Sequence, residues 1–147
     1  FVVPRHFFTP QIIKKRKPLA PTARRAGWVG CNILVNSIPE DGRIFVVDNG
    51  QVKRSDVVVK KLQKTEFLAE TNLDSRGWLL DIMNFINKLK GKEFSISEMY
   101  SFESSLYNLH PKNNNIQAKI RQQLQILRDK NYIEFLGNGK YRKQGDE

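Results

Sequence analysis

The amino-acid sequence lacks the features that disulfide-linked and membrane-spanning proteins need. Its 147 residues include one cysteine, Cys31, which excludes an internal disulfide framework and a cysteine-rich zinc site built from this chain. The apolar runs are only a few residues long, far short of the roughly 20 residues that cross a bilayer. With 39% hydrophobic and 27% charged residues, the composition predicts a soluble, globular protein of a reducing cytoplasm with no membrane partner.

Acidic residues are absent from the first 39 positions, although this stretch carries seven lysines and arginines. A second basic block, residues 112–143, has eight lysines and arginines against Asp129 and Glu134, whereas residues 40–92 are close to neutral. The whole chain has 25 Lys and Arg against 15 Asp and Glu, a formal charge of +10. Clustered positive charge attracts polyanions, so nucleic acid is the favoured partner class.

Recognisable catalytic patterns are also lacking. There is no glycine-rich phosphate loop and no serine or cysteine triad, and His6 and His110 lie far apart in the sequence. A glutamate, glutamine and lysine within residues 40–53 imitate a nuclease metal motif, but they supply only one carboxylate and adjoin a turn. We therefore expect no catalytic and no metal-binding residues in this chain, and Cys31 is expected to be a small buried hydrophobe.

The first 72 residues predict part of a sheet. An apolar run at positions 1–3 indicates a buried strand ending at Pro4, and residues 32–35 and 43–47 indicate two more strands. Asp48-Asn49-Gly50 is a hairpin turn signal, and a helix is expected over residues 56–67. These strands make up about half of a sheet domain, so we expect the chain to be a fragment whose remainder lies upstream.

The remaining residues predict three helices and a hairpin. Apolar residues at helical spacing, an Asp74-Ser75 cap signal and Gly91 predict a helix over 75–90. Ser95 and Glu98 form a capping box that begins a second helix, which ends at residue 110 before a proline. A third helix follows over 113–130, and a turn at 137–139 connects two strands. This order is typical of a winged helix-turn-helix, so the predicted fold class is α+β.

The third predicted helix has a polar face without an acid until Asp129. Asparagine and glutamine pair with adenine, arginine pairs with guanine, and alanine contacts the thymine methyl group. The candidate base-reading residues are Asn114, Gln117, Ala118, Arg121 and Gln122, with Gln125 on the same face, and the candidate phosphate contacts of the hairpin are Lys140, Arg142 and Lys143. Alternatively, the helix face is merely solvated and the hairpin charges protect an edge strand.

Arg24, Arg25 and Trp28 are the candidates in the first basic block. The segment could be a charged loop, and Trp28 could be an ordinary core residue or an exposed aromatic that stacks against a base.

Several long runs of the sequence are distinctive. The most specific is RKPLAPTARRAGW at residues 16–28, followed by GCNI at 30–33, GRIF at 42–45, SRGW at 75–78 and GKYRK at 139–143. In these runs and in their order, the sequence resembles the DpnI-like, or Dam-replacing, family of restriction endonucleases, and the resemblance spans essentially the whole chain.

Members of that family are magnesium-dependent type II endonucleases that cut GATC when its adenine is methylated. The resemblance implies that residues 1–72 are the C-terminal part of a PD-(D/E)xK nuclease domain and that residues 73–147 are the winged helix. It also implies that the Mg²⁺ ligands, the catalytic lysine and a structural Zn²⁺ site lie upstream of Phe1. Trp28 matches a tryptophan near the adenine methyl groups, and Arg24 and Arg25 would anchor the DNA beside it.

The resulting expectation is a bacterial, cytoplasmic and monomeric protein that binds double-stranded DNA containing adenine-methylated GATC and does not cut it alone. The alternative is a stand-alone winged-helix transcription regulator, which would be a dimer and indifferent to methylation.

Overall fold

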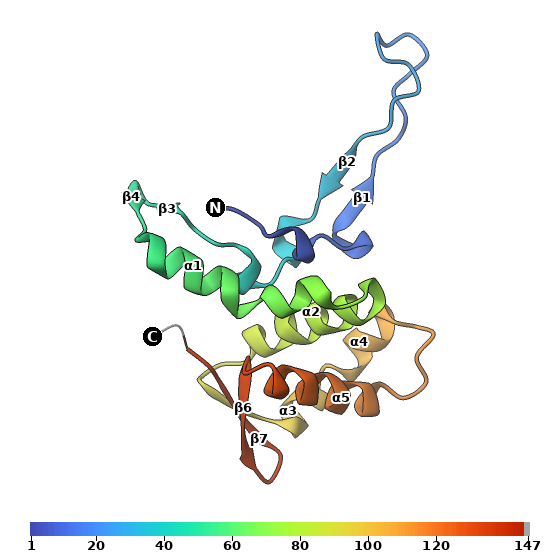
Figure 1. The fold of residues 1–147 in the computed structure, drawn as a ribbon. Coiled ribbons are helices and arrows are strands. Elements are labelled where there is room, and N and C mark those ends of the chain that lie inside the picture. The colour runs from blue at the N-terminus through green and yellow to red at the C-terminus, as the bar shows by residue number, and fades with distance from the viewer. Residues whose placement is uncertain (146–147) are drawn as a thin grey trace.

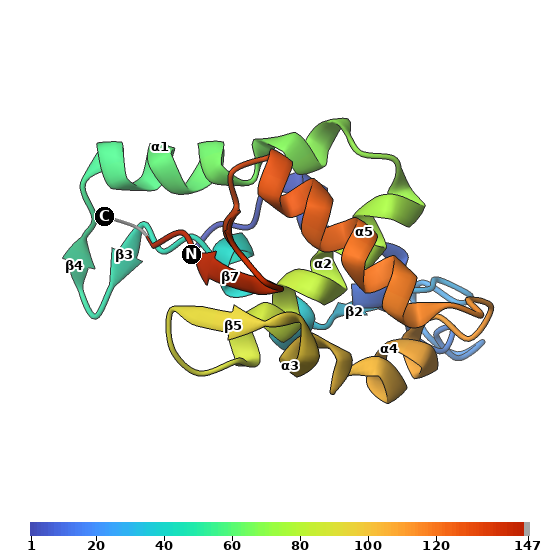
Figure 2. The same ribbon diagram turned by 90° about the horizontal axis from the view of Figure 1, so that it is seen from below.

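The computed structural model describes residues 1–145, and its C-terminal half is a helix-turn-helix with an attached β-hairpin (Figures 1 and 2). The elements of this half, in chain order, are α2 (Leu73–Lys88), β5 (Glu93–Ser95), α3 (Ile96–Tyr100), α4 (Glu103–Leu109), α5 (Ile116–Asp129), β6 (Ile133–Gly137) and β7 (Lys140–Lys143). The three strands form an antiparallel sheet in the order β5-β7-β6. The predicted order of helix, helix, helix and hairpin is confirmed.

Helix α2 is the central helix of the molecule. It begins where the side chain of Asn72 accepts a hydrogen bond from the backbone N–H of Ser75 at 2.9 Å, so the cap is Asn72 and not the predicted Asp74-Ser75 pair. It is buried along most of its length, including Leu79, Ile82 and Met83, which are fully inaccessible to solvent. Because two layers of the protein pack on it, α2 has no wide solvated face.

The second predicted helix is divided into α3 and α4. The capping box is present as predicted, with the Glu98 carboxylate accepting from the Ser95 backbone N–H at 2.7 Å. Ser101 and Phe102 then form a turn, and Leu109 at the end of α4 is half exposed. Strand β5 is not predicted by the sequence, where Ser95 indicates only the beginning of a helix.

Helix α5 packs on the face opposite the predicted polar face. Its side-chain cap is Asn115, which accepts from the Ala118 backbone N–H at 3.1 Å. The buried residues are Ile116, Ile120, Gln123, Leu124 and Leu127. Helix α5 therefore lies with one side on α2 and the other side toward solvent.

The N-terminal half consists of short elements and two extensions, and no strand among residues 1–72 is longer than three residues. Strands β1 (Ile13–Lys15) and β2 (Cys31–Ile33) pair at the base of one extension, and β3 (Val47–Asp48) and β4 (Gln51–Val52) lead into α1 (Ser55–Lys64) in the other. The 3₁₀ turns are Arg5–Phe7, Pro10–Ile12, Val35–Ser37, Glu40–Gly42 and Glu66–Glu70.

Several predictions for this half need correction. The first residues are not a buried strand, because Phe1 is 54% exposed and Val2 forms only a single bridge, to Ile44. Cys31 is exposed on β2 and is not a buried hydrophobe. The predicted helix 56–67 is shorter, since α1 ends at Lys64 and a 3₁₀ turn follows. The predicted turn is confirmed, with positive φ angles at Asn49 and Gly50.

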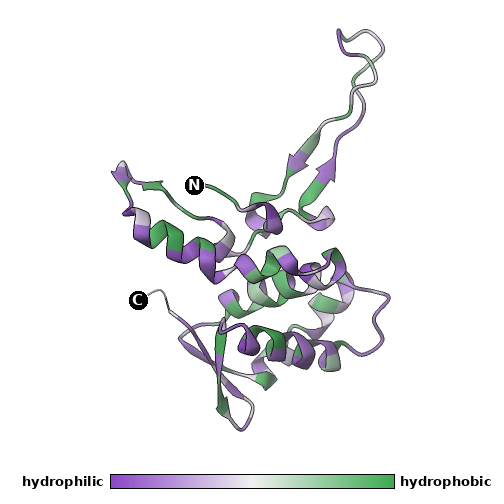
Figure 3. Ribbon diagram, viewed as in Figure 1, coloured by the Kyte–Doolittle hydropathy of each residue, from purple (hydrophilic) through white to green (hydrophobic). Residues whose placement is uncertain are grey.

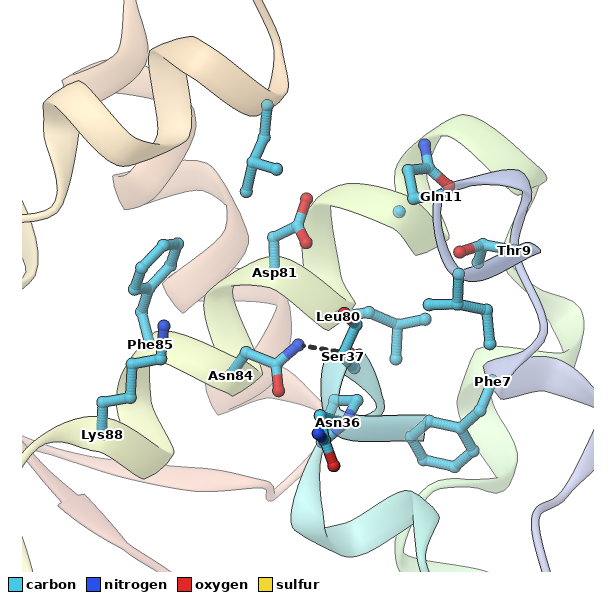
Figure 4. Close-up of a pocket in the computed structure, with 14 residues that line it drawn as sticks. Phe7, Thr9, Gln11, Asn36, Ser37, Leu80, Asp81, Asn84, Phe85 and Lys88 are labelled. Atoms are coloured by element: carbon cyan, nitrogen blue, oxygen red, sulfur yellow. Dashed lines mark hydrogen bonds between the residues drawn. The ribbon is translucent and has the colours of Figure 1, made fainter. Parts of the chain in front are cut away.

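One hydrophobic core joins the two halves. Phe7, Ile12, Ile38 and Leu68 belong to the same buried cluster as the residues of α2. The backbone approaches closely here, because a Cβ atom on Gly42 would lie 2.6 Å from the Phe7 ring. A cavity of about 230 Å³ remains at the interface between the two halves (Figure 4). Beside it the Asn84 amide donates to the carbonyl of Ser37 at 2.9 Å.

A buried histidine, His6, is expected to make the stability of the interface between the two halves depend on pH. The His6 ring Nε2 lies 3.2 Å from the Thr65 hydroxyl oxygen, and burial, reinforced by the positive charge of Arg76 and partly opposed by Glu66, lowers the pKa of His6. Below about pH 6.5 the unfolded chain therefore binds a proton that the folded chain resists.

We expect stability to be unaffected by His6 above about pH 6.5 and to decrease as the pH falls from there through the lowered folded-state pKa. Urea denaturation at a series of pH values measures this. The control is His6→Gln, which should remove this component of the acid sensitivity; an unchanged pH profile in that variant would show that other groups cause it.

Candidate nucleic-acid interface

The first candidate surface is an extended arm, residues 13–33, that projects away from the body of the protein (Figure 1). Beyond the paired strands, the Arg16 N–H donates to the Gly30 carbonyl and the Leu19 N–H donates to the Trp28 carbonyl, both at 2.9 Å. The arm has no acidic residue, and its six basic side chains are exposed: Lys14, Lys15, Arg16, Lys17, Arg24 and Arg25. It is therefore a narrow, positively charged projection.

Trp28 lies near the tip of this arm and is not a core residue. It is 53% exposed, and a tight turn holds its backbone, with the Trp28 N–H donating to the Arg25 carbonyl at 3.0 Å. Its indole lies against Gly30, where an added Cβ would be 2.9 Å from the ring, and Arg16 adjoins the same point. Of the two sequence interpretations, the structure supports the exposed aromatic.

The second candidate surface is the outer face of α5. Arg121, Gln122 and Gln125 are exposed there, and Ala118 is half buried. Gln117 is less free, because its amide donates to the Glu103 carboxylate of α4 at 2.9 Å. Asn114 is exposed in the turn just before α5, so the structure brings the other candidates together on the helix and leaves Asn114 outside it.

The hairpin β6–β7 presents less free charge than the sequence suggested. Arg142 bonds Glu93 at 2.8 Å and Glu134 at 3.3 Å, and these carboxylates, Glu93 foremost, raise its pKa above the ordinary value. The half-buried Lys143 donates to the Leu89 carbonyl at 2.6 Å. Lys140 is exposed, and no hydrogen bond or ion pair holds its side chain among residues 1–145.

The edge-strand explanation of these hairpin charges is wrong, because β7 is the middle strand of its sheet. Its cations do not protect an unpaired edge.

Two lysines and a tyrosine that the sequence did not single out adjoin the α5 surface. Lys112 and Lys119 line a shallow depression at the beginning of α5 together with Asn114 and Gln122. The sequence feature that could have indicated Lys112 and Lys119 is their place in the second basic block, residues 112–143. Tyr100 of α3 contacts Arg121 across 21 positions of sequence, which no local pattern reveals.

A stacked cluster fixes the turn that leads into α5. The rings of Trp78 and His110 stack at 3.7 Å between centroids, and His110 Nε2 lies 2.7 Å from the Asp81 carboxylate of α2. Burial raises the pKa of Asp81, an effect that the hydrogen bond to His110 opposes. The Lys119 ammonium lies 5.6 Å from the Trp78 ring centroid. These contacts hold the beginning of α5 against α2.

The arm and the α5 face are separate surfaces. Helix α5 and the hairpin lie on one side of α2, and the arm leaves from the other (Figures 1 and 2). The structure does not bring Arg24, Arg25 and Trp28 next to the α5 residues.

Within residues 1–145, no group of three or more His, Cys, Asp or Glu side chains is placed so that it could hold a metal ion. No helix in the described part of the chain has the length and apolar character to cross a membrane.

Comparison with protein families covers nearly the whole chain. Residues 1–71 match the model of the Dam-replacing family, and residues 74–143 match that of the Dam-replacing HTH domain. The second match coincides with α2 to β7, which independently form a helix-turn-helix and hairpin. The chain therefore belongs to the DpnI-like, Dam-replacing family of restriction endonucleases, and its C-terminal half is the DNA-binding helix-turn-helix domain of that family.

Proposed function

We propose that this chain is the DNA-reading part of a methyl-directed type II restriction endonuclease that acts on adenine-methylated GATC. The observation that carries the proposal is the pair of separate DNA-compatible surfaces: an acid-free arm with an exposed tryptophan, and an α5 face with exposed Arg121 and Gln122. Two surfaces of this kind would allow one monomer in the bacterial cytoplasm to engage methylated DNA with either half.

The α5 face suits the major groove, where arginine and amide side chains distinguish base pairs by their donor and acceptor patterns. Lys140 of the hairpin would contact a phosphate, and Arg142 and Lys143 would shape the hairpin and contribute less to phosphate binding, because protein acceptors already engage them.

Trp28 would sense the methyl group. An indole face gains dispersion and apolar burial against a methyl that protrudes into the major groove, and loses this contact on unmethylated DNA. Arg24 and Arg25 lie within the same turn of the arm, where they would bind the phosphates or guanine next to the methylated base.

Residues 1–72 would be a portion of the nuclease domain. Supporting this, many large apolar side chains of this half are exposed, and hydrophobic residues recur along α1 and on the segment that carries β3 (Figure 3). The exposed residues are Phe1, Val2, Phe45, Val47, Val52, Val57, Val59 and Leu62. Exposed apolar side chains in this number are typical of a surface that another part of a protein covers. The Mg²⁺ ligands and the structural Zn²⁺ site would then lie upstream, and this chain would bind without cutting.

Fluorescence anisotropy with three duplexes tests the proposal. The duplexes are otherwise identical and carry methylated GATC, unmethylated GATC or a scrambled site, and each is titrated at two salt concentrations. We expect the methylated duplex to bind most tightly, and Trp28→Ala to remove the difference between methylated and unmethylated DNA. Val29→Ala, an exposed neighbour on the same arm, is the matched control and should preserve it.

Tight binding that ignores methylation would favour a transcription regulator, and binding that loses all preference as salt rises would indicate a nonspecific basic protein.

A further inference from the structure

Arg121, an exposed arginine on the outer face of α5, is held by a neighbouring tyrosine. Its terminal nitrogen NH1 donates to the hydroxyl oxygen of Tyr100 at 2.7 Å. Tyr100 is the last residue of α3 and is half buried, whereas Arg121 is exposed. The half-buried Tyr100 of α3 therefore restrains the exposed Arg121 of α5.

The partner matters because it is uncharged. Arg128 of the same helix pairs with Asp129 at 2.8 Å, and Arg142 of the hairpin pairs with two glutamates. A carboxylate neutralises the arginine that it orients, whereas a tyrosine hydroxyl orients it and leaves its full charge. Arg121 is thus positioned and still positively charged.

The hydrogen bond also leaves the reading edge of Arg121 available. A guanidinium has five N–H donors, and the bond to Tyr100 uses one of them. The remaining donors can still form the bidentate contact with guanine O6 and N7. An arginine restrained before binding loses less rotamer freedom when it binds, so its contact contributes more to affinity.

We propose that Tyr100 is a specificity-determining positioning residue: its hydroxyl holds Arg121 in the orientation that reads a guanine of the site. This inference rests on the proposed function, because it requires α5 to lie in the major groove. Tyr100 itself need not touch a base.

The test is Tyr100→Phe, which removes the hydroxyl and keeps the ring. We expect affinity for methylated GATC to fall by up to about tenfold, the order of the rotamer freedom that Arg121 would then lose on binding, while binding to the scrambled duplex changes little. Tyr107→Phe is the matched control, because Tyr107 is an exposed tyrosine of α4, and it should leave both affinities unchanged. Equal thermal unfolding midpoints of both variants would show that the fold is intact.

A double-mutant cycle separates positioning from a structural role. If Tyr100 acts through Arg121, Tyr100→Phe should have no further effect in an Arg121→Ala background. As a second readout, replacing the guanine of the site by 7-deazaguanine removes N7, so the wild-type chain should lose affinity and Tyr100→Phe should lose much less.

Additive losses in the cycle would overturn the positioning role, as would a Tyr100→Phe variant that binds all duplexes like the wild type. A wild-type chain that does not distinguish GATC from the scrambled site would instead overturn the proposed function, and the positioning role with it.

Discussion

Replacing Phe7 by alanine is expected to lower the free energy of unfolding of the whole chain by about 3–5 kcal/mol. The Phe7 ring is completely buried in the seam between the N-terminal half and α2, packed closely against the turn at Gly42. Removing it loses the transfer free energy of an aromatic ring and enlarges a seam that already contains a cavity. Because the core is continuous with α2, the loss should affect the helix-turn-helix as well.

Guanidinium denaturation followed by tryptophan fluorescence measures this effect. In a Trp28→Phe background the remaining tryptophan, Trp78, is buried in α2 and reports the C-terminal half. We expect Phe7→Ala to move the Trp78 transition to lower denaturant concentration. The adjacent Phe8, which is 37% exposed, supplies the control, and Phe8→Ala should cost much less.

A Trp78 transition that does not move would show that the two halves unfold independently. The predicted boundary between residues 72 and 73 would then separate two cooperative units. If the transition moves, the two halves form one cooperative unit. A change in the N-terminal half can then alter the stability of the DNA-binding half.

The helix-turn-helix half was predictable from the sequence because its signals are local. Helical spacing of apolar residues, the Ser95–Glu98 capping box and the glycine-containing turn before Lys140 each act within a few residues. Strand β5 was missed because its buried residue, Phe94, also suits the hydrophobic position just before a helix cap. Its identity as a strand comes from pairing with Tyr141, far along the chain.

The N-terminal half was less predictable because its apolar residues have few partners within the chain. Apolar character at Phe1 and Val2 indicated burial, but burial requires a neighbouring surface, and these residues are exposed. The same limit applies to the candidate site. Its residue type and its place on the polar face of the predicted helix indicated that Arg121 could read a base. The contact with Tyr100, in contrast, depends on how α3 and α5 pack.

The α5 face and the hairpin should respond differently to substitution. Arg121→Ala removes donors that suit a base edge, so we expect it to cost about 1–3 kcal/mol of discrimination between GATC and altered sites. Lys140→Ala removes a phosphate contact, so it should weaken binding to every duplex alike. It should also reduce the slope of log affinity against log salt concentration by about one. Titrations of both variants with methylated and altered duplexes at several salt concentrations measure both quantities.

The control for net charge is Lys60→Ala, because Lys60 is an exposed lysine of α1, outside the helix-turn-helix half. It removes one positive charge without touching either surface and should change affinity less than Lys140→Ala. Equal losses for Arg121→Ala and Lys140→Ala on every sequence would mean that α5 contacts only the DNA backbone. Sequence reading would then have to come from the arm, whose Arg24, Arg25 and Trp28 would be the next residues to replace.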